Sequence, residues 1–172
     1  MKPITRMGTA VFTLGALIWS AGQAQQHDQP QALVLVAHNL MADDSAHRDL
    51  VRRGGESSAL LPGDLMSYDL RFTNLLRDSV QRVTFDNPLP HGMRYVAQSA
   101  KASRQDVIVE FSIDSGRSYS ATPMVERVVD GRKVREAAPP ESYTNVRWRI
   151  AGWVRPGVQV TAQFRAKFDP KH

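Results

Sequence analysis

Residues 158–168 read VQVTAQFRAKF and hold the longest alternation of apolar and polar residues in the chain. The apolar positions are Val158, Val160, Ala162, Phe164, Ala166 and Phe168. Because successive side chains of a β-strand point to opposite faces, this two-residue period predicts a strand with one buried face. The turn sequence Arg155-Pro156-Gly157 stands directly before it and sets where the strand begins.

The same period recurs upstream between turn sequences, and we find no sustained helical period after the N-terminus. Alternating apolar residues predict strands around 33–36, 66–72, 83–85, 93–97, 107–113, 124–129, 133–136 and 146–150. Asp130-Gly131 predicts a two-residue hairpin turn, and residues 41–59 are expected to form a loop or irregular edge. About eight or nine strands with short connections favour an all-β, antiparallel, two-sheet sandwich.

The first 24 residues have the three zones of a cleavable export signal. Lys2 and Arg6 are basic, residues 7–19 are apolar, and Gly22 and Ala24 are small residues suited to a signal peptidase. About a dozen apolar residues fall short of the roughly 20 that span a bilayer. We therefore expect a signal helix over residues 1–24, cleavage after Ala24, and no transmembrane segment in the mature chain.

The remaining chain suits one domain without covalent cross-links. We expect residues 25–32 to form a flexible leader and residues 33–169 a single domain. The chain has no cysteine, so neither disulfides nor thiol chemistry are available. Removing residues 1–24, which hold two basic and no acidic residues, lowers the net charge from +5 to +3. Such a mild charge favours a solvated surface over nucleic-acid binding.

Several turn and core residues match those of a known family. The elements are Pro62-Gly63-Asp64, Tyr68, Asn74, Pro88-Leu89-Pro90, Gly92 and Tyr95, with the later segments Phe111–Gly116 and Tyr143–Trp148, then Pro156-Gly157 and Phe164. They resemble the bacterial conserved repeat domain called domain of unknown function 11, in its short exported single-copy form. The resemblance implies an immunoglobulin-like sandwich and no enzymatic activity, and it carries over no site residues. Leu75-Leu76 and Asn87 depart from the family pattern, which usually has Gly and Asp there.

A search for catalytic motifs finds none of the usual sequence signatures, including nucleophile elbows, zinc-binding His pairs, phosphate loops and calcium loops. Asp43-Asp44 and Glu126 are the acids considered as a carboxylate pair, but nothing in the sequence brings them together. We therefore predict no enzyme, no catalytic residues and no cofactor site.

The alternative to a purely structural role is copper binding. Cleavage after Ala24 would place His27 third in the mature chain, where an amine, two backbone nitrogens and an imidazole suit Cu(II). His38 with Met41 and His91 with Met93 add soft ligands, although Met93 belongs to an apolar strand face. Without a spaced ligand cluster, we assign no metal residues.

The sequence thus favours a non-catalytic module of the cell envelope, periplasmic or secreted. It would have a structural or protein-interaction role, with an envelope protein or surface polymer as its partner. The sequence does not identify that partner or the oligomeric state.

Overall fold

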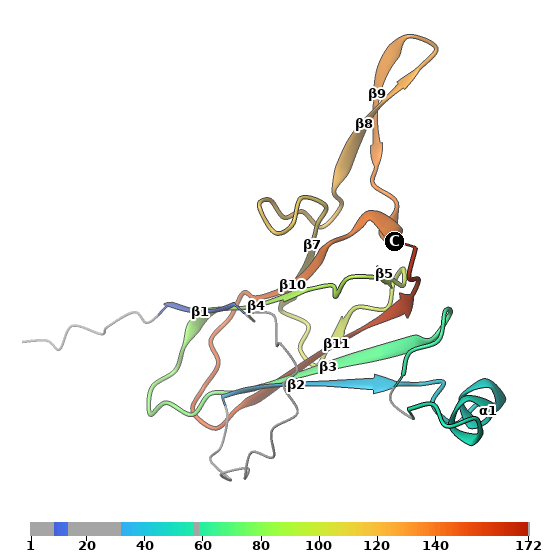
Figure 1. Ribbon diagram of the computed structural model, residues 1–172. Helices are drawn as coiled ribbons and strands as arrows, with labels where there is room; N and C mark the ends of the chain where they lie inside the picture. The colour runs from blue at the N-terminus through green and yellow to red at the C-terminus, as the bar shows by residue number, and fades with distance from the viewer. Residues whose placement is uncertain (1–8, 14–31, 57–58, 172) are drawn as a thin grey trace, which may run out of the picture.

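The computed structural model describes residues 9–13, 32–56 and 59–171, and strands, nearly all of them paired antiparallel, are its main secondary structure (Figure 1). A four-stranded sheet, here sheet A, has the order β1-β4-β10-β7. Sheet B has the order β2-β3-β11-β5 with β6 also paired to β11, and β8 and β9 form a separate two-stranded ribbon. The elements are β1 (Thr9–Thr13), β2 (Leu33–Asn39), α1 (Ser45–Arg52), β3 (Leu65–Thr73), β4 (Gln81–Pro88), β5 (Met93–Tyr95), β6 (Lys101–Ala102), β7 (Val107–Ser112), β8 (Met124–Val129), β9 (Arg132–Ala137), the 3-10 turn η1 (Pro140–Ser142), β10 (Asn145–Ile150) and β11 (Gln159–Phe168).

Strand β11 runs through the middle of sheet B, as its sequence predicts. It pairs with β3 from Gln159↔Thr73 to Lys167↔Leu65, and its other side pairs with β5 and β6. The apolar positions from Val160 to Ala166 are buried, whereas the residues between them are intermediate or exposed. The preceding turn places Gly157 at φ 72°, a left-handed conformation that favours glycine.

The core joins side chains from both sheets. Phe72 of sheet B lies 5.5 Å from Phe85 of sheet A, measured between ring centroids, and Trp148 of sheet A lies 5.8 Å from Phe164 of sheet B. Tyr95 of β5 contacts Phe111 of β7 at 5.0 Å. Since each fully buried large apolar side chain contributes about 1.5–3 kcal/mol, these contacts are a main source of stability in a chain without disulfides.

The structure confirms the buried positions that the sequence assigns to Tyr68, Tyr95 and Trp148, which are 6 %, 4 % and 0 % exposed. It also confirms the turn at Asp130-Gly131, where both residues have positive φ. The predicted strand total is too low, because the sequence does not predict β1 or the two-residue strand β6, which pairs with β11. A strand of two residues is too short to show a period.

The prediction of a loop for residues 41–59 is wrong for its central part, which forms helix α1. Asp44 is the N-cap, because its side chain accepts a hydrogen bond from the His47 backbone N–H. Two turns of helix are too short to give a clear helical period in the sequence. Helix α1 lies at one end of sheet B (Figure 1).

Residues 9–13, expected within a signal helix, form strand β1 on the edge of sheet A instead. Thr9, Val11, Phe12 and Thr13 are residues that favour extended backbone. The rest of the predicted signal, Ala24 and nearly all of the leader lie outside the described residues. Among the described helices, neither the length nor the apolar character needed to cross a membrane is present.

Candidate functional site

The β8–β9 ribbon, here called the arm and comprising residues 124–137, projects away from both sheets (Figure 1). Its strands pair in unbroken register from Met124↔Ala137 to Val129↔Arg132. At its base, Ala138 is buried and its N–H donates to the carbonyl of Pro123 at 2.8 Å. Val125 also packs against the core, so the base of the arm is anchored and its tip is not.

The outer part of the arm exposes apolar side chains. Val128 is 70 % exposed, Val129 49 % and Val134 43 %. Isolated two-stranded hairpins are at best marginally stable in water, because they bury little apolar surface. Aliphatic residues at the tip of such a ribbon contribute little to folding, which makes the arm the leading candidate for an interaction surface.

The arm also carries charges on both faces and has two free edges among the described residues. Opposite residues share a face, so Glu126 lies beside Arg135 and Val128 beside Lys133. On the other face, the Arg127 Nε atom contacts Glu136 at 3.3 Å. Within the described chain, neither outer edge of the ribbon pairs with a further strand. Unpaired backbone edges and exposed valines together suit the addition of a partner strand or surface.

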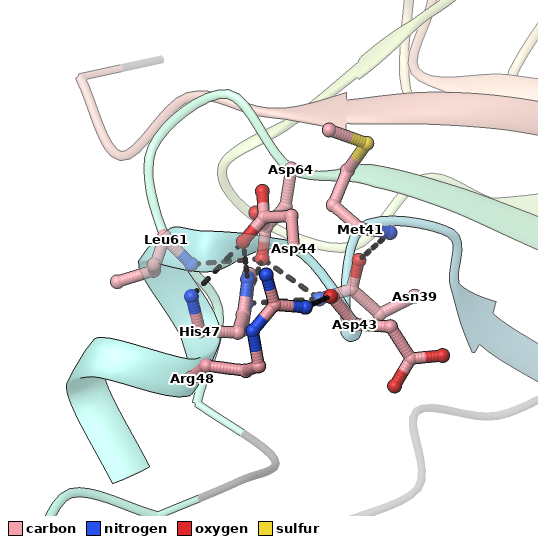
Figure 2. A network of polar contacts seen from close by, with 8 residues as sticks. All are labelled: Asn39, Met41, Asp43, Asp44, His47, Arg48, Leu61 and Asp64. Atoms are coloured by element: carbon pink, nitrogen blue, oxygen red, sulfur yellow. Dashed lines mark hydrogen bonds and ion pairs between the residues drawn. The ribbon is translucent and has the colours of Figure 1, made fainter. Parts of the chain in front are cut away.

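The most concentrated polar cluster lies elsewhere, where α1 meets the loop before β3 (Figure 2). We call it the His47 clasp: Asn39, Asp44, His47, Leu61 and Asp64. His47 is 1 % exposed, and its ring nitrogens lie 3.1 Å from Asp44 Oδ1 and 2.9 Å from Asp64 Oδ2. Asp64 Oδ2 also accepts hydrogen bonds from Asn39 Nδ2 at 2.8 Å and the Leu61 N–H at 2.9 Å. One carboxylate oxygen thus joins three segments of the chain.

The electrostatics of the clasp favour a protonated imidazole. The hydrogen bond that the His47 ring donates to Asp44 raises the pKa of His47 above its ordinary 6.5, and the charge of Asp64 adds to this effect. The hydrogen bonds from the His47 backbone and side chain lower the pKa of Asp44. In the protonated ring, both nitrogens are donors, and each lies within hydrogen-bond distance of a carboxylate. The clasp therefore joins α1 to the loop before β3.

A second polar network covers the outer face of sheet A. The Tyr119 hydroxyl donates to Asp86 Oδ2, and the Arg147 guanidinium lies 3.6 Å from the Tyr119 ring centroid. Arg147 and Arg149 bind the two oxygens of Glu110 at 2.9 Å and 3.3 Å. Burial, assisted by the bond to Asp86, raises the pKa of Tyr119.

The residues that the sequence analysis weighed as shared catalytic or metal sites lie apart in the structure. Asp44 belongs to the clasp and Glu126 to the arm, so they form no carboxylate pair. Met93 is buried in the core, and His91 is exposed in a turn. His27 lies outside the described residues.

His38 lines an open hollow on the outer face of β2, β3 and β11, together with Val36, Asp69 and Arg71. Within the described ranges, His, Asp and Glu side chains do not gather in groups of three that would suit a metal ion.

Sequence reasoning missed His47 and the exposure of the arm. The signal for the clasp is Asp44 three residues before His47, which is the spacing of an N-cap.

No protein-family model matches the chain, and no curated protein matches it. The resemblance to the conserved repeat domain thus depends only on the turn and core residues quoted above.

Proposed function

We propose that this protein is an exported, non-catalytic immunoglobulin-like sandwich that binds another component of the cell envelope through its arm. The observation that carries the proposal is the exposure of Val128, Val129 and Val134 on a ribbon whose two outer edges pair with no other described strand. The polar clusters are consistent with it. In the His47 and Tyr119 networks, the polar side chains bond to one another.

The sandwich itself is supported by the contacts between sheets. Phe72 with Phe85 and Trp148 with Phe164 bring the inner faces of sheets A and B into one core. Two mainly antiparallel sheets around one core, of this size, are typical of immunoglobulin-like domains. The export signal, with cleavage after Ala24 and a periplasmic or secreted location, is part of the same proposal.

A photo-crosslinking residue placed at Val128 tests the role of the arm in intact cells. The matched control carries the same residue at Leu76, which is 61 % exposed but lies on the loop between β3 and β4. We expect a discrete adduct in the envelope fraction from position 128 and none from position 76. With the crosslinking residue moved to Val134, the chain that keeps Val128 should give the same adduct. The Val128→Asp variant should lose most of it, because a carboxylate disfavours an apolar contact. Equal capture from both positions, or none from position 128, contradicts the proposal.

The export part has a separate readout. Terminal sequencing of the envelope-associated protein should find Gln25 as its first residue. A chain that retains residues 1–24, or that stays in the cytoplasmic fraction, would refute export and leave the crosslinking result to be judged independently.

A further inference from the structure

The outer edge of strand β4 is held by one neighbour among the described elements. On its inner side, β4 pairs antiparallel with β10 from Asn145↔Pro88 to Arg149↔Thr84. On its outer side, β1 runs parallel to it, with Val11↔Thr84, Phe12↔Phe85 and Thr13↔Asp86 opposite one another (Figure 1). β1 is the last strand of sheet A on that side.

All of β1 lies within residues 1–24, which the proposed export would remove. Cleavage removes the described partner strand of the outer N–H and C=O groups of β4. These groups border the core directly, since Val83 and Phe85 of the same strand are 0 % and 1 % exposed. Between Gln81 and Asn87, β4 contains no Pro; its charged residues are Asp86 and Arg82, whose φ is 55°, and the part of its outer edge that pairs with β1 in unbroken register is residues 84–86.

We propose that the outer edge of β4 in the processed protein is an acceptor site for an extended segment of a partner protein, running parallel to β4. This inference depends on the cleavage in the proposed function. The strand seated there in the full chain shows the chemistry that fits. Its sequence, TAVFT, is uncharged, free of Pro and Gly, and rich in β-branched and aromatic residues. Main-chain hydrogen bonds would supply the affinity, as in other cases of strand addition.

The direction of β1 argues against a second copy as the occupant. A two-fold axis through a continuous sheet makes two copies of β4 antiparallel to each other, whereas β1 is parallel to β4. The charged residue at the end of the β1 pairing, Asp86, already binds Tyr119 and Asn145. The partner segment therefore needs no charged side chain opposite Asp86. The partner segment is therefore expected to be a short apolar strand of about five residues.

Amide hydrogen exchange on the full chain tests the acceptor site. The double substitution Val11→Pro with Phe12→Pro removes two adjacent N–H groups, and since neighbouring groups point to opposite sides, one of them faces β4. The matched control, Val11→Ile with Phe12→Tyr, keeps two strand-forming residues. We expect the proline variant to raise exchange of the β4 amides by about tenfold or more, with β3 and β11 unchanged. The control variant should behave as wild type.

A synthetic peptide of residues 8–14 should then restore β4 protection in the proline variant. The same peptide carrying both prolines should not. Unchanged β4 exchange in the proline variant, or no rescue by the peptide, overturns the acceptor site. Faster exchange throughout β3 and β11 also overturns it, because β1 would then be an integral part of the fold. Dimerisation of the proline variant without peptide, seen by sedimentation, would replace the partner by a second copy.

These outcomes are separable from those of the proposed function. A chain found uncleaved in the envelope refutes export without changing the exchange result. A cleaved chain whose β4 edge accepts no peptide refutes the acceptor site alone.

Discussion

Replacing Asp64 by Ala tests whether the His47 clasp fastens α1 to the rest of the protein. Asp64 is 4 % exposed, and one of its oxygens accepts from the Leu61 N–H, Asn39 Nδ2 and His47 Nε2. The substitution leaves three donors without an acceptor, one of them on a charged ring. Each buried donor left alone costs about 1–3 kcal/mol. Because α1 and its loop lie at the surface and can admit water, we expect a total loss of about 3–5 kcal/mol.

The assay is urea unfolding followed by circular dichroism at pH 6. Asp49→Ala is the matched control, because Asp49 is an acid on α1 whose ion pair with Arg52 is exposed. Exposed pairs of this kind contribute about 0–1 kcal/mol. Amide exchange over residues 45–52 should also accelerate in Asp64→Ala and stay unchanged in Asp49→Ala. If the two variants lose the same stability, the clasp does not hold the helix.

The pH dependence of the wild type gives an independent check on the clasp. The folded-state pKa of His47 is raised above 6.5, so its stabilising contribution is complete below pH 6.5 and is lost as pH rises through the folded value. The folded-state pKa of Asp44 is lowered below 3.8, so its contribution is present above pH 3.8 and is lost as pH falls through the folded value. The clasp should therefore be strongest between about pH 4 and 6.5. In His47→Gln the decline above pH 6.5 should disappear, and an unchanged decline would contradict the assignment.

Four further substitutions probe the core and its loops, each measured by urea unfolding. Trp148→Phe should stay within about 1 kcal/mol of wild type, because removing a buried indole N–H that has no partner offsets the small cavity, whereas Phe164→Ala should cost about 3–5 kcal/mol. Gly152→Ala should cost about 1–3 kcal/mol, since its Cβ would lie 2.5 Å from Asp106 Oδ2, and adding Asp106→Ala should recover part of the loss. Asn74→Ala should cost about 2–4 kcal/mol, because its buried side chain makes three hydrogen bonds to backbone groups.

The strands that form the core could be predicted because burial imposes a two-residue period on them. β3, β10 and β11 lie where their alternating residues predict. Helix α1 could not be predicted in the same way, because it is only two turns long and depends on the Asp44 cap and the contact of His47 with Asp64. Those partners are separated by 20 residues or fewer in sequence, but no periodic pattern connects them.

The arm shows a different limit of sequence reasoning. The Asp130-Gly131 turn and both of its strands are predictable from residue types. The exposure of these strands is not predictable, because Val128, Val129 and Val134 are residues of the type found in core strands. Only the three-dimensional arrangement shows that the ribbon leaves the sheets after Pro123 and returns at Ala138.

The central position of β11 in sheet B also sets the time at which this protein can fold. β3 emerges early from the ribosome, but its partner β11 spans residues 159–168 and is made almost 100 residues later. Until then sheet B has a gap in its middle, with β5 and β6 also lacking their only described partner strand. Pairings between segments so distant in sequence form slowly. Sheet B is therefore completed only at the end of synthesis, after most of the chain has been made.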